Sequence, residues 1–425
     1  MSDNTKCDKK PIPKTDKKTI SRRGFVAGAA AAPALFHIVP AHCLGGPKHT
    51  APSETFGAAL IGAGGRGPGT FRDLSGKHGL SIRKLAYCDV KYVGSADNKT
   101  RYTDFRRLLE RKDLDIVAIA TPPHWHALIS IAAMEAGKDV VCEKPLTRTI
   151  AEGRAVVEAS KRYGRILQVG TYGRFGASGN AGHRETHKIM RSGVKLPHEV
   201  VHHHRGGLKV KQWSGKVDLK PSDPPANLDW DMYCGPSPLK PFTGPRHGGT
   251  HRWFWDYDGG GLADMGQHKL DPLNWIYGRD DTSPTEITPY APPAHPEVCG
   301  MWGWVEMKYA DGFTLVVESG EWGERYSRKK ARGVSLSDLP EADRKKVEAM
   351  PDPPKLVGFG EAVKTRQLAG GHPEAAHRTV TLMHLMNIAI RLGRKLNYDP
   401  VKERFVGDEE ANALANQPMR APWRL

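Results

Sequence analysis

One candidate for chemistry is the lysine of the motif Glu143-Lys144-Pro145. It follows residues 139–142, which predict a buried strand, and ligands bind at the carboxyl ends of strands in parallel sheets. A lysine placed there can hydrogen-bond a substrate hydroxyl and stabilise the oxygen as it becomes a carbonyl. An exposed Lys144 that pairs with Glu143 fits the position equally well.

A second candidate lies just after the three glycines 259–261. Asp264 and His268 are spaced i, i+4, so a helix would place both on one face. This pairing suits proton abstraction, with His268 as the general base and Asp264 orienting it. A metal site has no third ligand with comparable support. A helix-capping role for Asp264 remains the structural alternative.

A glycine cluster follows the apolar residues 56–61 and has the pattern G-x-G-x-x-G, formed by Gly62, Gly64 and Gly67. Gly62 would allow a tight turn, Gly64 a close approach of the backbone to a pyrophosphate, and Gly67 close packing of helix on strand. The pyrophosphate would lie at a helix N-terminus. Asp89 ends the next predicted strand, where its carboxylate would accept hydrogen bonds from ribose hydroxyls and repel a 2′-phosphate. The pattern therefore predicts a dinucleotide site that favours NAD over NADP.

These residues require a scaffold of buried strands alternating with helices. Apolar runs without alternation predict a parallel sheet covered on both faces. We expect helices at 125–136, ended by Gly137, and at 150–163, ended by Gly164. The expected strands are residues 56–61, 82–88, 115–120, 139–142 and 166–169. The stretch 90–103 is short and polar and lacks the helix that a regular unit would place there.

The pattern changes after Gly170, which predicts a second domain of α+β type with a mainly antiparallel sheet. Residues 301–309 and 313–319 alternate and predict a hairpin, and 377–396 predict an amphipathic helix. A helix is expected at 181–192, a strand at 199–204, an exposed excursion at 325–355 and an irregular polar end. The domains would be residues 1–50 (export signal and linker), 55–170 (α/β Rossmann domain) and 171–425.

Composition favours a soluble, mildly basic enzyme that binds an anionic cofactor. Hydrophobic residues make up 39% and charged residues 26%, and the net charge of +16 includes no dense basic run in the body of the chain. Diffuse charge of this kind argues against a nucleic-acid partner. The six cysteines show no CxxC pair or regular spacing, which argues against a zinc site and a disulfide framework.

The N-terminus indicates export. Paired arginines, Arg22 and Arg23, precede a short Ala-rich apolar stretch that is too short to span a bilayer comfortably. This pattern is typical of a twin-arginine signal and would place the protein in the periplasm. A basic tail without a signal function is the alternative. His42 before Cys43 is a poor match to a lipoprotein signal, and no later segment predicts a transmembrane span.

Taken together, the motifs resemble the glucose–fructose oxidoreductase/inositol dehydrogenase/rhizopine-catabolism (Gfo/Idh/MocA) family over residues 55–425. The marks are the glycine loop, residues 121–126, Glu143-Lys144-Pro145 and the Asp264/His268 pair. The ending 420–423 and the export signal resemble the secreted branch of this family. Pro123 departs from the pattern, because related exported proteins often carry Asp there.

The resemblance implies that Lys144 is the central catalytic residue, with Pro145 often in a cis peptide, and that Asp264 and His268 complete the substrate site. Tyr172 and Arg174 would face the substrate, and the second sheet would mediate a homodimer or homotetramer. His124 and Trp125 would line the nicotinamide end of the cofactor. The full predicted cofactor-binding set is Gly62, Gly64, Gly65, Arg66, Gly67, Asp89, Thr121, Pro122, His124, Trp125, His126, Glu143 and Lys144.

Three histidines, His202, His203 and His204, invite a metal interpretation. In a strand, His202 and His204 share one face. Because no Cys or Asp completes a site, we favour half-buried polar residues over pocket or metal ligands.

The sequence therefore supports an NAD(P)-dependent dehydrogenase that acts on a hydroxyl or carbonyl of a sugar, glycoside or polyol. A redox-neutral glycoside hydrolase or lyase that passes through a transient keto-sugar is the alternative. A protein that binds the nucleotide without turnover is a third possibility.

Overall fold

The computed structural model describes residues 54–208 and 219–425. Its first half contains a parallel sheet of six strands in the order β3-β2-β1-β4-β5-β6. The strands are β1 (Thr55–Ile61), β2 (Ser81–Cys88), β3 (Arg101–Tyr102), β4 (Ile116–Ile119), β5 (Asp139–Cys142) and β6 (Leu167–Val169). The associated helices are α3 (Gly67–Asp73), α4 (Phe105–Leu109), η2 (Pro123–Trp125), α5 (His126–Glu135) and α6 (Ile150–Tyr163).

Successive side chains of the central strands point to opposite faces, and both faces are covered. On β1, Leu60 packs with Phe71 of α3 and with Phe359, which belongs to a helix near the C-terminus. Its neighbour Ile61 packs on the other face, in the cluster that includes Ile129 of α5. This two-sided burial explains the unbroken apolar runs and confirms the predicted Rossmann-type sheet.

The second half forms a mixed sheet of six strands in the order β12-β11-β8-β9-β10-β7, in which only the β10–β7 pairing is parallel. The predicted mainly antiparallel sheet and its hairpin, β9 with β10, are confirmed. The strands are β7 (Val201–Arg205), β8 (Glu286–Tyr290), β9 (Trp304–Lys308), β10 (Thr314–Glu318), β11 (Leu396–Asp399) and β12 (Arg404–Phe405).

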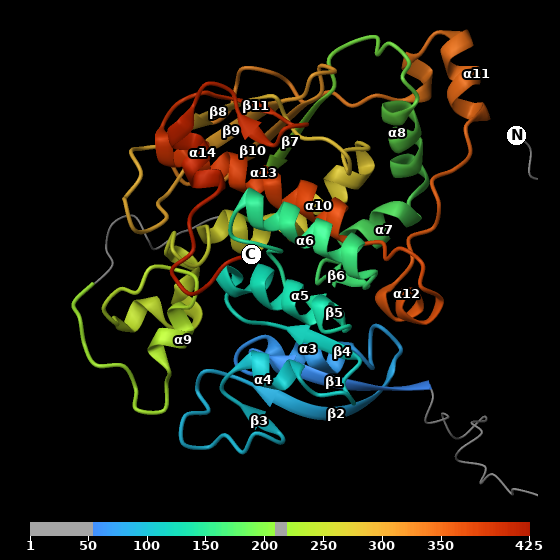
Figure 1. The fold of residues 1–425 in the computed structure, drawn as a ribbon. Helices are drawn as coiled ribbons and strands as arrows, with labels where there is room; N and C mark the ends of the chain where they lie inside the picture. The colour runs from blue at the N-terminus through green and yellow to red at the C-terminus, as the bar shows by residue number, and fades with distance from the viewer. Residues whose placement is uncertain (1–53, 209–218) are drawn as a thin grey trace, which may run out of the picture. The chain divides into compact units, whose positions relative to one another are not determined.

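The second half also contains helical segments, and these contact strands of both sheets. They are α7 (Gly173–Gly179), α8 (Ala181–Arg191), α9 (Trp230–Cys234), η3 (Gly244–Arg246), η4 (Gly248–Trp253), α10 (Gly260–Ile276), η5 (Leu336–Asp338), α11 (Glu341–Ala349), α12 (Phe359–Thr365), α13 (Pro373–Leu392) and α14 (Glu409–Ala415). Figure 1 shows α6, α10 and α13 lying between the two sheets.

Helix α13 is not amphipathic, although the sequence predicted an amphipathic helix at 377–396. It contacts α6 and β6 on one side and α10 and β8 on the other, so nearly every residue along it is buried. It also starts before residue 377 and ends at Leu392, and residue 396 already begins β11. A helix enclosed on all sides has no polar face to mark it, and its Thr, His and Arg side chains are buried as well.

Two other expectations need revision. The exposed excursion at 325–355 contains the short surface helix α11, and the end predicted to be irregular contains β12 and α14. The expected absence of a helix directly after β2 is confirmed, since residues 89–100 form only turns and bends before β3. The first and second sheets belong to one compact unit, Ser53–Leu425.

Candidate active site

The glycine loop connects β1 to α3 and needs glycine at both of its ends. Gly62 has φ +88°, and a Cβ there would lie 2.5 Å from the amide nitrogen of Thr121. A Cβ on Gly67 would lie 2.1 Å from the carbonyl oxygen of Gly62. These close approaches are the tight turn and the close packing that the glycine pattern predicted. Gly67 thus supports the loop from below and is not among the described residues that line the cavity.

The middle of the loop is open. Within residues 54–208 and 219–425, the backbone N–H groups of Gly64, Gly65 and Arg66 have no acceptor. A Cβ on Gly65 would meet nothing within 4 Å. Unpaired amides facing open space form a cradle for an anionic group, so the loop fits the diphosphate of a dinucleotide.

Asp89 directly follows β2, as the sequence predicted, and it hydrogen-bonds the glycine loop. Its Oδ2 accepts a hydrogen bond of 2.8 Å from the amide of Ala63, and its Oδ1 accepts one of 3.0 Å from the amide of Lys91. The carboxylate also lines the cavity described next. It is therefore held beside the glycine loop, with room for further hydrogen bonds.

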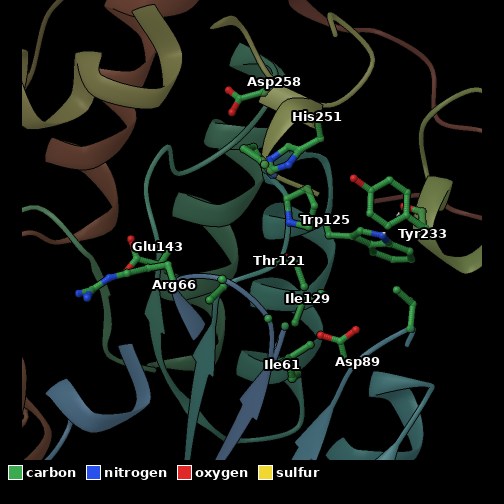
Figure 2. A pocket seen from close by; sticks show the side chains of 18 of the residues that line it. Ile61, Arg66, Asp89, Thr121, Trp125, Ile129, Glu143, Tyr233, His251 and Asp258 are labelled. Atoms are coloured by element: carbon green, nitrogen blue, oxygen red, sulfur yellow. Dashed lines mark hydrogen bonds and ion pairs between the residues drawn. The ribbon is translucent and has the colours of Figure 1, made fainter. Parts of the chain in front are cut away.

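A cavity of about 570 Å³ runs from Asp89 and the glycine loop to Lys144, Asp264 and His268. This volume lies in the range typical of small-molecule and cofactor sites. Figure 2 shows Asp89 and Ile61 at one end of the cavity, Glu143 with Arg66 at one side, and His251 and Asp258 at the other end. The predicted cofactor loop and the predicted catalytic residues thus share one space.

Lys144 follows β5 and forms an ion pair with Asp264. Its Nζ donates to Oδ1 of Asp264 at 2.7 Å and to the backbone oxygen of the same residue at 2.5 Å. The Lys144–Pro145 peptide bond is cis, as the resemblance implied. The alternative of an exposed lysine paired with Glu143 is wrong, because the Lys144 side chain is only 14% exposed and its carboxylate partner is Asp264.

Glu143 instead joins the glycine loop. Its Oε1 accepts hydrogen bonds from the hydroxyl of Thr70 at 2.6 Å and from Nε of Arg66 at 3.1 Å. Both Glu143 and Arg66 line the cavity. The buried carboxylate fixes the side chain of Arg66 at the open loop, where a guanidinium can compensate a diphosphate.

Asp264 and His268 both lie on α10 and line the cavity, but they do not pair. Burial would raise the pKa of Asp264, and the charges of Lys144 and Arg252 lower it by more, so the carboxylate stays ionised. Within the described residues no hydrogen bond joins His268 to Asp264. The expectation that Asp264 orients His268 is therefore wrong, because Lys144 and Arg252 take the carboxylate.

His268 can accept a proton near neutral pH. Burial lowers the pKa of its imidazole, and the nearby charge of Lys144 lowers it further. A neutral imidazole in a cavity next to a lysine ammonium has the protonation state that a general base needs.

Asp258, Arg252 and His251 are among the cavity residues that the sequence did not predict. Asp258 is 6% exposed and precedes the three glycines; burial, and next the charge of Asp264, raise its pKa to about 7. Arg252 donates from Nε to Oδ1 of Asp264 at 2.9 Å. Burial lowers the pKa of His251 to about 4. Acids on both sides of the triple glycine could have identified Asp258, but no local pattern marks Arg252 or His251.

Some residues of the segment 121–126 line the cavity, and others are buried behind it. Thr121, Pro122 and Trp125 line the cavity. The buried residues His124 and His126 are not among the described lining residues, which corrects their assignment as cofactor contacts. The ring nitrogens of His126 lie 2.7 Å from the backbone oxygen of Pro145 and 2.8 Å from that of Thr121. His126 thus couples the loop after β4 to the loop that carries Lys144.

The predicted substrate residues also differ. Tyr172 lines the cavity. Arg174 does not belong to the described lining; its side chain is 1% exposed and hydrogen-bonds Asp271 at 2.8 Å and Asp280 at 3.0 Å. The expectation that Arg174 faces the substrate is therefore wrong, because both carboxylates hold its guanidinium in the interior.

The three histidines of β7 are half-buried structural residues, as favoured. Nδ1 of His202 lies 3.0 Å from the Tyr277 hydroxyl, and Nε2 of His203 lies 2.7 Å from Glu318. Over residues 54–208 and 219–425, no group of three or more His, Cys, Asp or Glu side chains could hold a metal ion. In the same part of the chain no helix has the length and apolar character needed to cross a membrane.

Comparison with known proteins identifies relatives that match parts of the chain. Levoglucosan dehydrogenase of Pseudarthrobacter phenanthrenivorans is 51% identical over 59 residues, 14% of this chain and 15% of the relative. Inositol 2-dehydrogenase of Salmonella paratyphi B is 31% identical over 150 residues, 33% of this chain and 42% of the relative. A glycosyl hydrolase family 109 protein of Solibacter usitatus is 32% identical over 140 residues, 29% of this chain and 32% of the relative. The chain thus matches less than half the length of each.

Among solved structures, the WlbA dehydrogenase from Bordetella pertussis in complex with NADH and UDP-GlcNAcA has a TM-score of 0.51 at 14% identity, over 81% of this chain and 99% of that chain. It shares the fold. The family model for the oxidoreductase NAD-binding Rossmann fold matches residues 56–171, and the model for the oxidoreductase C-terminal alpha/beta domain matches residues 180–425. The chain therefore belongs to the Gfo/Idh/MocA oxidoreductase family and carries its NAD-binding Rossmann domain.

Proposed function

We propose that the protein is an NAD-dependent oxidoreductase that interconverts a hydroxyl and a carbonyl group on a sugar, glycoside or polyol. The observation that carries the proposal is the shared cavity, which joins the glycine loop and Asp89 to Lys144, Asp264 and His268. Two relatives also support the proposal, because their names describe them as dehydrogenases of levoglucosan and of inositol, which are both polyhydroxylated compounds.

Bound NAD would supply the hydride acceptor. Oxidation of a carbinol then requires that the C–H hydrogen leave as hydride and the O–H hydrogen leave as a proton. Lys144 is placed to hydrogen-bond the hydroxyl oxygen and to stabilise the negative charge that develops there. His268 is the neutral base that accepts the proton, and Asp264 fixes the position of the Lys144 ammonium.

The proposal is tested with purified protein, NAD and a panel of sugars, glycosides and polyols. We expect NADH to form with at least one polyhydroxylated substrate, and Lys144→Met to slow its formation about 10²–10³-fold while NAD binding persists. If NAD binds but no compound of the panel is oxidised, and no corresponding carbonyl compound is reduced, the proposed activity is wrong.

A redox-neutral glycosidase is the second candidate, supported by the match to a glycosyl hydrolase family 109 protein. Oxidation of one hydroxyl would acidify the neighbouring C–H, and loss of that proton would eliminate the alcohol of the glycosidic bond. Water would then add to the resulting enone, and the hydride would return to the carbonyl carbon of the sugar. Cleavage of a nitrophenyl glycoside without net NADH, with solvent deuterium incorporated at the acidified carbon, would favour this candidate over the simple dehydrogenase.

Export and assembly are further parts of the proposal. The arginine pair Arg22 and Arg23 lies outside the described residues, so its support is the sequence pattern alone. A reporter fused to residues 1–50 should reach the periplasm, and Arg22→Lys with Arg23→Lys should retain it in the cytoplasm. The proposed homodimer or homotetramer is checked by light scattering on the purified protein.

A further inference from the structure

The side of the cavity beside Asp89 is built partly by the second half of the chain. Where a regular unit would place a helix after β2, α9 lies against the turn instead: the amide of Asp229, its N-cap, donates to the backbone oxygen of Val90 at 3.0 Å. Met232 and Tyr233 of α9 line the cavity. His247 lines it too. Burial and the charge of Lys91 lower the pKa of its imidazole, and the nearby charge of Asp89 opposes this shift.

Trp125, which the resemblance placed at the nicotinamide end of the cofactor, instead attaches α9 to the first sheet. Its indole Nε1 donates to the backbone oxygens of Met232 at 3.1 Å and Tyr233 at 3.2 Å. A ring nitrogen of His124 lies 2.8 Å from the same oxygen of Tyr233. A Cβ on Gly235 would lie 2.1 Å from the Trp125 ring, so the backbone here touches the indole. Figure 2 shows Tyr233 and Trp125 side by side at the edge of the cavity.

Residues of the C-terminal segment contact both α9 and Trp125. Nε of Arg420 donates to the backbone oxygen of Gly235 at 2.9 Å, and its Nη1 donates to the carboxylate of Asp231 at 2.8 Å. The ring of Trp423 packs edge-on against Trp125, with centroids 4.8 Å apart. Neither Arg420 nor Trp423 belongs to the described residues that line the cavity.

We propose that Met232 and Tyr233 bind the adenosine half of NAD and that Arg420 and Trp423 hold them in place, so the C-terminal segment controls cofactor release. The proposal rests on NAD binding by this family's Rossmann domain and not on the substrate chemistry proposed above. Asp89, whose carboxylate would bind the adenosine ribose, precedes the turn that α9 contacts at Val90, and residues of both line the cavity. Release of adenosine past α9 requires the contacts with Trp125 and Arg420 to loosen.

The experiment compares the wild-type chain with Arg420→Ala and Trp423→Ala. Dissociation of NAD and of ADP-ribose is followed by stopped-flow fluorescence after displacement. Arg420→Ala loses hydrogen bonds to α9, and Trp423→Ala loses the ring contact with Trp125, which in turn binds α9. Neither residue lines the cavity, so we expect both ligands to leave roughly tenfold faster, the effect of one charge-assisted hydrogen bond or aromatic contact. Nicotinamide mononucleotide, which lacks the adenosine half, should show unchanged affinity.

The matched control is Arg404→Ala, another C-terminal arginine, which is 60% exposed and paired with Glu409 on the surface. Thermal unfolding without ligand establishes that each variant is folded. Should Arg420→Ala misfold, Arg420→Lys and Asp231→Asn provide milder tests of the same contact. Unchanged release of NAD and ADP-ribose in folded variants would overturn the proposal, as would a wild-type chain that binds neither ligand. Loss of substrate turnover with normal NAD binding would count only against the proposed activity.

Discussion

The Nζ atom of Lys144 lies 2.7 Å from Oδ1 of Asp264, although 120 positions separate the two residues along the chain. Lys144 follows β5 of the first sheet, and Asp264 lies on α10, which packs against α13, α7 and α8 of the second half of the chain. The pair thus forms only when both halves of the chain are assembled. It places a cation and a carboxylate in the lining of the cavity that the glycine loop also lines.

Substitutions of this pair should reduce catalysis far more than cofactor binding. Lys144→Met removes the group that stabilises the developing oxyanion, and we expect kcat to fall about 10²–10³-fold. Asp264→Asn keeps the shape but loosens the ammonium, so a smaller fall is expected. The double variant should be no worse than Lys144→Met, because Asp264 acts through Lys144. Multiplicative losses in steady-state kinetics would contradict this dependence.

His268→Asn should lower kcat about 10²–10⁴-fold if His268 is the general base. Because burial and Lys144 lower the pKa of His268, the wild-type imidazole remains neutral as the pH falls below about 6.5. The wild-type rate should therefore persist into mildly acidic solution before it declines. A pH profile of kcat measures this, and His268→Asn should remove that decline. An unaltered profile in the variant would exclude His268 as the base.

Asp258→Asn should change how stability depends on pH. The pKa of Asp258 is about 7 in the folded chain, against about 4 for a solvated carboxyl. Its stabilising contribution is therefore fully present below about pH 4 and is lost as the pH rises through 7, at up to about 1.4 kcal/mol per pH unit. The amide does not ionise, so Asp258→Asn should gain stability relative to wild type between pH 5 and 7, roughly. Urea unfolding across this range measures the difference, and parallel curves for both proteins would contradict the shifted pKa.

Asp89→Asn should relax the choice of cofactor. The amide oxygen can still accept from the Ala63 amide, so the loop keeps its shape while the negative charge disappears. We expect NADP to bind roughly tenfold tighter relative to NAD, because the repulsion of the 2′-phosphate is lost together with one charge-assisted hydrogen bond. Titration calorimetry with both cofactors checks this ratio. If wild type and variant show the same ratio, Asp89 does not set the preference.

Arg174→Met should destabilise the fold without acting on the substrate. Its removal would leave the carboxylate of Asp271, which is 1% exposed, without its cationic partner. Breaking a buried ion pair in this way costs about 3–5 kcal/mol. Urea unfolding measures the loss, and the exposed Arg404→Ala, expected to cost about 1 kcal/mol or less, serves as the comparison. A raised KM with unchanged stability would instead place Arg174 in the substrate site.

The sequence by itself determined the Rossmann scaffold and its cofactor loop, because these features are local. Gly62 and Gly67 could be identified from the spacing of the glycines alone. Gly62 has a positive φ, and at both positions neighbouring backbone lies too close for a side chain, so other residues are excluded. The buried strands were equally readable, since strands covered on both faces are apolar throughout. Lys144 and the Asp264/His268 pair were also found, each from a short motif, but the sequence did not determine which side chain pairs with which.

Only the tertiary structure decided those pairings. Asp264 binds Lys144 and Arg252 and not the histidine one turn further along its own helix, because the fold brings Nζ of Lys144 within 2.7 Å and Nε of Arg252 within 2.9 Å of its Oδ1. Arg174 follows the fifth predicted strand as a substrate residue would, yet two carboxylates from other parts of the chain draw it inside. The position of α9 beside Asp89 could not be predicted from the sequence either, since contacts between residues more than 100 positions apart leave no periodic or spaced pattern in a single sequence.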